Sequence, residues 1–278
     1  MLVATATPTL CVSLFGPLRL RHQTGHHPLN LTGATRELLA FLLTRAGEAS
    51  RREVLIETFW PDATLEKGRS ALTTALWRVK KVLGRTPGLG LYTFDDLVSI
   101  ETDEDVLVDV VALESAGALA RREMNDAGAL DPQTRRQLAT AVRAVSGPFL
   151  EGCDSHWVLI ERERLTGVYI SKVRLLMRDA EARRAYDDGL DWGRLLLATD
   201  PLLEAVHHDM IALYARAGER RRAILQYETL WEVLHNELGI EPNPATRALR
   251  DRILAGEPAT AAMIDVAAGR SDAALAEL

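Results

Sequence analysis

The sequence predicts a mainly α-helical protein, in which a small module of short strands and three helices precedes a larger all-helical domain. Between residues 10 and 31, short β-prone runs alternate with turn residues, as in a small antiparallel sheet. Three segments with helical apolar stripes follow, and a hairpin pattern ends the module near residue 100. Beyond Glu114, apolar residues recur with helical spacing up to about residue 256.

The expected strands of the module lie at residues 10–15, 18–22 and 28–31. A first helix is predicted from Thr35 to Ala46, because its leucines form one stripe and Gly47 follows. Ser50 and Glu53 have the spacing of a capping box, so a second helix is expected to begin there. This second helix is expected to end before Pro61, because proline cannot continue a helix.

The third helix of the module is predicted over residues 66–83, with Asp62 or Thr64 as its cap. At ~100° per residue, its apolar residues share one sector that should pack on a core. This stripe consists of Leu72, Leu76, Val79 and Leu83, with Ala71 and Ala75 beside it. The opposite face carries Lys67, Ser70, Thr74, Trp77, Arg78 and Lys81.

A β-hairpin is predicted after the third helix, with residues 91–94 and 97–101 flanking Asp95-Asp96. The order of sheet, three helices and hairpin is that of a winged helix, in which the second and third helices form a helix-turn-helix and the third enters the DNA major groove. Lysine and arginine bind phosphates, arginine can also fork onto guanine, and hydroxyls bond either phosphate or base. An ordinary solvated helix can carry the same charges, but this position in a winged helix favours DNA recognition.

Charge is unevenly distributed along the 278 residues, whose net charge is −6. Residues 1–100 hold 12 Lys and Arg against 8 Asp and Glu, a net of +4, and the remainder holds 21 against 31, a net of −10. A nucleic-acid surface must therefore be local to the N-terminal module. The expected divisions are a flexible N-terminus at 1–9, a winged-helix domain at 10–105, a helical domain at 106–256 and a flexible tail at 257–278.

The C-terminal domain is expected to consist of antiparallel helix pairs, because its helical segments are separated by short breaks with glycine or proline. Several segments have the lengths and turn chemistry of tetratricopeptide units, whose period is ~34 residues. These segments are residues 165–185, 190–199, 203–217 and 220–238. Their tryptophans and tyrosines are expected to pack between helices rather than to form a ligand cage.

No pattern in the sequence is typical of an enzyme, so we expect no catalytic residue, metal ion or cofactor. His26-His27 and His207-His208 are adjacent pairs, and neighbours on a helix diverge by ~100°, which is unsuitable for sharing one ion. No phosphate-binding glycine loop and no G-x-S-x-G turn is present. The two cysteines are far apart in sequence, which favours a reducing compartment, and no signal peptide or membrane span is recognisable. We therefore expect a cytoplasmic protein.

Several separated motifs resemble one protein family and occur in its order. LLAFLLTRAGEASRREVLIETFWPD and RSALTTALWRVKKVLG resemble the DNA-binding half of SARP-type bacterial activators, an OmpR-type winged helix with an extra leading sheet. VDVVALE, PFLEG and LGIEPNPATRALRDRIL resemble the bacterial transcriptional activation domain of the same regulators. The resemblance spans about residues 10–256, nearly the full chain.

The resemblance implies that the third helix contacts DNA through eight residues: Lys67, Arg69, Ser70, Thr73, Thr74, Trp77, Arg78 and Lys81. We expect base contacts from Ser70, Thr74, Trp77 and Arg78, and phosphate contacts from the other four. The wing tip Asp95-Asp96 departs from the family, whose wings commonly carry a cation, because carboxylates are repelled by phosphate. This wing is expected to contact little DNA or to contact protein, although the two acids can also serve only as an Asx-type turn.

The function that the resemblance implies is that of a sequence-specific transcriptional activator associated with the bacterial nucleoid. Its expected partners are double-stranded promoter DNA and RNA polymerase holoenzyme with its sigma factor, and two protomers would bind as a homodimer on direct repeats. One alternative is a helical-repeat adaptor whose winged helix contacts another protein. Another is a ligand-sensing regulator with an effector site between repeat helices, in which Arg220 to Arg222 contact an anion.

Overall fold

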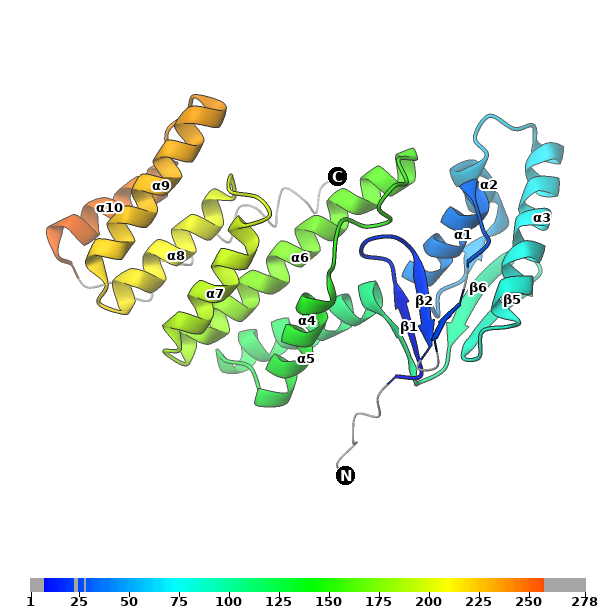
Figure 1. Ribbon diagram of the computed structural model, residues 1–278, viewed down its shortest axis with the longest axis horizontal. Helices are drawn as coiled ribbons and strands as arrows, with labels where there is room; N and C mark the ends of the chain where they lie inside the picture. The colour runs from blue at the N-terminus through cyan, green and yellow to red at the C-terminus, as the bar shows by residue number, and fades with distance from the viewer. Residues whose placement is uncertain (1–7, 23–24, 28, 258–278) are drawn as a thin grey trace. The chain divides into compact units, whose positions relative to one another are not determined.

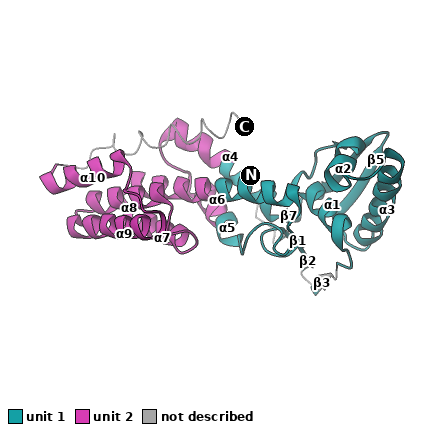
Figure 2. Cartoon of the chain, turned by 90° about the horizontal axis from the view of Figure 1, so that it is seen from above, with its two compact units in different colours: residues 1–117, 140–169 teal, residues 118–139, 170–278 magenta. Residues whose placement is uncertain are grey.

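The computed structural model describes residues 8–22, 25–27 and 29–257, most of them helical. They form two compact units, one of Met1–Gly117 with Thr140–Tyr169 and one of Ala118–Ala139 with Ile170–Leu278 (Figure 2). These packing units do not coincide with the expected division at residue 105, which stays a prediction about domains. The expected flexible ends, 1–9 and 257–278, lie almost entirely outside the described residues.

The first sheet of unit 1 has four strands in the order β3-β2-β1-β7. Its two central strands, β1 and β2, lie side by side in Figure 1. Its strands are β1 (Leu10–Ser13), β2 (Arg19–His22), β3 (Gly25–His27) and β7 (Val106–Val108). The first three are antiparallel neighbours as expected, whereas β7 pairs parallel with β1. The prediction of a strand at 28–31 was wrong, because the third strand pairs earlier, with His27 opposite Leu20.

Three helices cover the core of unit 1: α1 (Gly33–Thr44), α2 (Arg52–Phe59) and α3 (Leu65–Leu83). Four of their leucines, Leu38, Leu39, Leu55 and Leu72, are completely inaccessible to solvent. Thr64 caps α3 by accepting a hydrogen bond from the Lys67 amide, as one of the two expected caps. The capping box at Ser50 was wrong, because Ser50–Arg51 forms strand β4 and α2 begins at Arg52 without a side-chain cap.

The second sheet of unit 1 contains the wing, in the strand order β4-β6-β5. Strands β5 (Leu89–Phe94) and β6 (Leu97–Thr102) form the predicted hairpin, with Phe94 opposite Leu97 and Asp95-Asp96 at the tip. Strand β4 (Ser50–Arg51) pairs antiparallel with β6. Val98 and Ile100 of β6 are buried, so one face of the hairpin packs on the core while its tip is exposed. The observed order of sheet, three helices and hairpin confirms the predicted winged helix-turn-helix.

Residues near position 150 complete the core of unit 1. The segment around Phe149 adds to the end of β1, since the Leu150 amide donates to the Leu14 carbonyl and the Gly16 amide to the Pro148 carbonyl, both at 2.9 Å. The Phe149 ring is 1% exposed. The motif PFLEG is therefore part of the fold that carries the winged helix.

Trp157, at the start of α6 (His156–Ala182), is the centre of an aromatic cluster in unit 1. Its ring meets those of Phe41, Phe59 and Phe149 edge to face, with centroids 5.6–5.9 Å apart. Such pairs add to the free energy gained from burial alone. The Trp157 indole N–H also donates to the Glu37 carboxylate on α1, which fixes the start of α6 against α1.

Asp109, the first residue of α4 (Asp109–Ala127), joins this helix to the end of β1. Its carboxylate accepts hydrogen bonds from the amides of Leu14, Phe15 and Val110 at 2.8–3.0 Å. Burial raises the pKa of Asp109, although these three amide hydrogen bonds act in the opposite direction. The carboxylate thus satisfies backbone donors that would otherwise be buried without partners.

Unit 2 consists of consecutive helices that pack on one another. Besides parts of α4, α5 (Pro132–Ala144) and α6, it contains α7 (Tyr186–Leu197), α8 (Glu204–Arg216), α9 (Arg220–Leu238) and α10 (Pro244–Ala255). Helices α7, α8 and α9 contact in sequence, and α10 contacts both α8 and α9. Gly193 on α7 permits a close approach to α8, because an added Cβ there would lie 2.6 Å from the Met210 sulfur. This packing confirms the predicted tetratricopeptide-like arrangement.

Conspicuous polar residues of unit 2 have partners within the fold. His207 bonds the Pro201 carbonyl and Gln226, and burial lowers its pKa. Arg220 donates to the Leu254 carbonyl, and Arg222 pairs with Glu219. In the described part of the chain, no cluster of His, Cys, Asp and Glu suits a metal ion, and no helix is long and apolar enough to cross a bilayer.

Candidate nucleic-acid interface

Helix α3 has one buried face and one exposed face. Its buried residues are Gly68, Leu72, Ala75, Leu76, Val79 and Leu83, which include the whole predicted stripe. All eight predicted contact residues are exposed: Lys67, Arg69, Ser70, Thr73, Thr74, Trp77, Arg78 and Lys81. The Trp77 side chain is 61% exposed, an unusual fraction for so large an apolar ring. The structure therefore brings the whole predicted set together on one accessible surface.

The exposed residues of α3 form a central row and two flanks. At about 100° per residue, the direction opposite the buried face is occupied by Ser70, Thr74, Trp77 and Lys81. Lys67 and Arg78 lie on the flank nearer α1, and Arg69, Thr73 and Lys80 lie on the other flank. The helix carries five cations and one acid, Glu66, so its exposed face favours a polyanion.

Local contacts determine what these side chains offer to a partner. The hydroxyls of Thr73 and Thr74 donate to the carbonyls of Arg69 and Ser70, four residues earlier. In this arrangement both threonines present a methyl group and an oxygen acceptor, which suits base edges better than phosphate. The Lys81 ammonium lies 5.3 Å from the centre of the Trp77 ring, so the two side chains form one cation–π unit.

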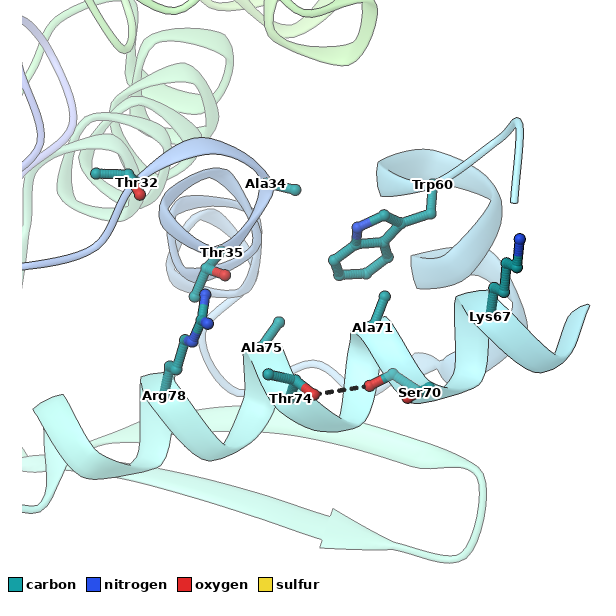
Figure 3. A pocket seen from close by; sticks show the side chains of 10 residues that line it. All are labelled: Thr32, Ala34, Thr35, Trp60, Lys67, Ser70, Ala71, Thr74, Ala75 and Arg78. Carbon is teal, nitrogen blue, oxygen red and sulfur yellow. Dashed lines mark hydrogen bonds between the residues drawn. The ribbon is translucent and has the colours of Figure 1, made fainter. Parts of the chain in front are cut away.

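A groove of about 500 Å³ lies between α3, the start of α1 and the end of α2 (Figure 3). Its lining combines two cations, several hydroxyls and small apolar groups, and contains no acid. The lining residues are Thr32, Ala34, Thr35, Trp60, Lys67, Ser70, Ala71, Thr74, Ala75 and Arg78. Arg78 extends across the groove toward Thr35, and the Trp60 ring projects into it (Figure 3). Four predicted contact residues thus border one groove.

Trp60 and Thr35 belong to this surface but were not among the predicted contact residues. Thr35 lies on α1 and Trp60 is the residue after α2. Both come close to α3 only in the folded chain. The sequence signal at Trp60 was its position immediately before Pro61, which indicates a helix end and nothing about the opposite wall of a groove. The apolar periodicity of each helix predicts its buried face, but it does not predict which other helices lie beside it.

The wing has an acidic tip on an apolar hairpin. Asp95 has a φ of 49°, a left-handed conformation that aspartate tolerates in tight turns. The aromatic side chains beside the tip are exposed, Phe94 by 76% and Tyr92 by 55%. An acidic and aromatic surface is unsuited to phosphate and suits a protein partner. The expectation that the wing contacts little DNA or contacts protein therefore stays open.

Comparison with known proteins identifies relatives of both halves of the chain. The sequence model of the bacterial transcriptional activator domain matches residues 108–254. Regulatory protein AfsR of Streptomyces coelicolor is 30% identical in an alignment of 254 positions that covers 87% of this chain and 24% of AfsR. Transcriptional regulatory protein MoaR1 of Mycobacterium bovis is 25% identical in an alignment of 282 positions that covers 98% of this chain and 88% of MoaR1. The chain spans about a quarter of the length of AfsR.

A solved structure has the same fold. It is that of Mycobacterium tuberculosis EmbR in complex with a low affinity phosphopeptide, with a TM-score of 0.72 and 22% identity. The match covers 97% of this chain and 71% of the EmbR chain. The likeness therefore extends over the winged helix and the helical repeats together.

Proposed function

The chain belongs to the bacterial transcriptional activator domain family, as a regulator of the SARP type, and we propose that it is a sequence-specific DNA-binding activator. The observation that supports this proposal is the exposed face of α3, on which eight potential contact residues lie together on the third helix of a winged helix-turn-helix. In this fold the third helix enters the major groove. Within the central row, Ser70, Thr74 and Trp77 would then face the bases, and Lys81 would contact a phosphate.

The helical unit would contact the transcription machinery. We propose that two protomers bind direct repeats at a promoter and hold RNA polymerase holoenzyme, including its sigma factor, through the helical repeats. Direct repeats require a head-to-tail arrangement of the winged helices, unlike the inverted half-sites of a two-fold dimer. Exposed apolar side chains on α9, such as Trp231 at 40% and Leu238 at 54%, supply surface for protein contacts.

The decisive experiment is a binding selection with purified protein and fragmented genomic DNA at moderate salt. The proposal predicts one enriched motif, repeated in the same orientation. Enrichment of an inverted repeat would contradict the head-to-tail arrangement, while absence of any enriched sequence would contradict DNA recognition itself. Addition of polymerase holoenzyme is expected to increase the affinity for promoter fragments that carry the motif.

Replacing Trp77 by alanine is expected to weaken binding to the selected motif by about 5- to 150-fold, which corresponds to roughly 1–3 kcal/mol. The reason is that the ring lies in the central row and has no core to stabilise, being 61% exposed. Binding to scrambled DNA should change little. Titration of both duplexes by fluorescence anisotropy measures the two affinities.

A matched control is Trp231→Ala, because Trp231 is another exposed tryptophan and lies in unit 2. It is expected to leave the affinity of one protomer for a single motif copy unchanged. If Trp77→Ala lowered the affinity for the motif and for scrambled DNA equally, base reading by the ring would be contradicted. Circular dichroism of each variant verifies that α3 remains folded.

A protein-binding winged helix is the second candidate function, favoured by the acidic tip and exposed aromatics of the wing. It predicts negligible affinity for any DNA at moderate salt. Replacing Phe94 by serine would then abolish capture of a protein partner, whereas the proposed DNA recognition by α3 would be unaffected. The same selection experiment distinguishes the two functions.

A further inference from the structure

Arg78 and Lys67 lie on the flank of α3 that faces the groove. Arg78 is displaced by about 60° from the centre of the exposed face, whereas Ser70 and Thr74 are displaced by about 20°. Its side chain extends across the groove toward Thr35 on α1 (Figure 3). A guanidinium directed toward a neighbouring helix is poorly placed to fork onto a base in front of α3.

The chemistry of the groove suits an anion with an adjoining apolar part. Cations stand near both ends, Lys67 and Arg78, and hydroxyls of Thr35 and Ser70 lie between them. The Trp60 ring and three alanines provide apolar surface, and no carboxylate lines the groove. A sugar-phosphate chain offers the same combination of charged oxygens and apolar sugar carbons.

The dimensions favour a nucleic-acid strand over a free ion. Lys67 and Arg78 are eleven residues apart on α3, which places their Cα atoms about 16 Å apart along the axis at 1.5 Å per residue. One strand of a duplex carries a phosphate every ~3.4 Å of helix axis, so a strand can engage both cations at once. An inorganic phosphate ion would reach only one of them.

We propose that this groove binds the sugar-phosphate backbone of one DNA strand, with Arg78 and Lys67 as phosphate contacts and Thr35 and Trp60 as the opposite wall. The proposal rests on DNA binding by α3 and changes the expected role of Arg78 from base reading to backbone binding. The bases would then be read by Ser70, Thr74 and Trp77, of which Ser70 and Thr74 also border the groove.

The test compares the wild type with Arg78→Ala and Arg78→Lys on the selected motif and on scrambled duplex, across a series of salt concentrations. If Arg78 contacts a phosphate, Arg78→Ala should lower the affinity for both duplexes by the same factor, about two- to fivefold. The slope of log affinity against log salt should fall by about 0.9. Arg78→Lys should retain most of the affinity, because lysine also binds phosphate.

A loss of affinity for the motif alone in Arg78→Ala, which Arg78→Lys does not restore, would overturn the proposal and make Arg78 a base reader. Unchanged binding of both duplexes by Arg78→Ala would overturn it as well. The control Arg136→Ala removes an exposed arginine of unit 2 and is expected to change neither the affinity ratio nor the slope. Failure of the wild type to bind any duplex would instead refute DNA recognition, and this proposal with it.

A final arm distinguishes a DNA strand from a free anion. Inorganic phosphate is titrated against wild type and Arg78→Ala while the melting temperature is followed. The proposal predicts no Arg78-dependent rise at millimolar phosphate, but a clear rise with duplex. An Arg78-dependent rise with phosphate alone would identify the groove as a site for a small anion and overturn the strand assignment.

Discussion

Replacing Phe149 by alanine is expected to lower the free energy of unfolding of unit 1 by about 3–5 kcal/mol. The ring is 1% exposed and packs edge to face against Trp157, so its removal leaves a cavity among aromatic neighbours. Phe149 also lies between backbone hydrogen bonds that join residues 148–151 to Leu14 and Gly16. Loss of the ring should therefore destabilise residues 148–151 as well as the core.

Urea unfolding followed by fluorescence measures this effect, because Trp157 lies inside the affected cluster. The control is Phe94→Ala, which removes the same side chain where it is 76% exposed on the wing, with an expected change below about 0.5 kcal/mol. Similar losses for the two variants would show that Phe149 is not part of the core. DNA affinity of the folded fraction of Phe149→Ala should remain close to that of the wild type.

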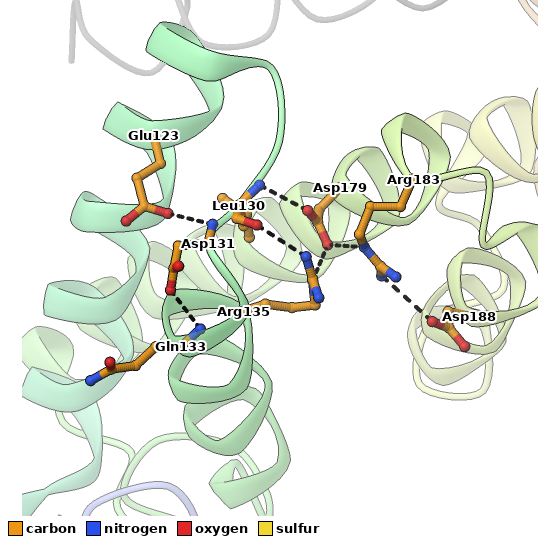
Figure 4. A network of polar contacts seen from close by, with 8 residues as sticks. All are labelled: Glu123, Leu130, Asp131, Gln133, Arg135, Asp179, Arg183 and Asp188. Atoms are coloured by element: carbon orange, nitrogen blue, oxygen red, sulfur yellow. Dashed lines mark hydrogen bonds and ion pairs between the residues drawn. The ribbon is translucent and has the colours of Figure 1, made fainter. Parts of the chain in front are cut away.

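Replacing Asp179 by alanine is expected to lower the free energy of unfolding of unit 2 by about 2–4 kcal/mol. Asp179 is fully buried on α6 and accepts hydrogen bonds from the Leu130 amide, Arg135 and Arg183 (Figure 4). Its loss leaves a buried amide and two guanidinium groups without their acceptor. Both arginines are about a quarter exposed, so water partly replaces the lost acceptor and keeps the effect within this range.

The control is Asp188→Ala, since Asp188 is 62% exposed and pairs with Arg183 at 3.5 Å. Exposed ion pairs contribute about 0–1 kcal/mol, so this variant should unfold nearly as the wild type does. A double-mutant cycle of Asp179→Ala with Arg135→Ala isolates the coupling between the two side chains. Equal stabilities of the Asp179 and Asp188 variants would contradict a structural role for the buried carboxylate.

The arrangement of α3 was predictable from the sequence because it depends on local periodicity. Leu72, Leu76 and Val79 recur at helical spacing, and the structure confirms that they are buried while the predicted contact residues are exposed. The hairpin around Asp95-Asp96 was also predictable, since its two strands are adjacent in sequence. The helix pairs of the C-terminal part were predictable from segment lengths and turn residues, which are also local features of the sequence.

Other features depend on partners that are distant in sequence. Strand β7 pairs with β1, whose residues lie 96 positions earlier, and Phe149 packs beside residues 14–16, more than 130 positions away. The end of α2 and the start of α1 meet α3 to form the groove, which changes the expected role of Arg78. Helical periodicity specifies which face of a helix is buried, but it does not specify which element covers that face or where an exposed side chain extends.

The sequence by itself therefore determined the order of the elements, the buried stripe of α3 and the residues on its exposed face, because each depends on neighbours within a few turns. Only the tertiary structure decided which of those residues border a groove and that Trp60 and Thr35 form its other wall. It also placed the segment around Phe149 in the core of the winged-helix unit. These features arise from packing between elements far apart in the chain, whose free energy depends on burial in three dimensions.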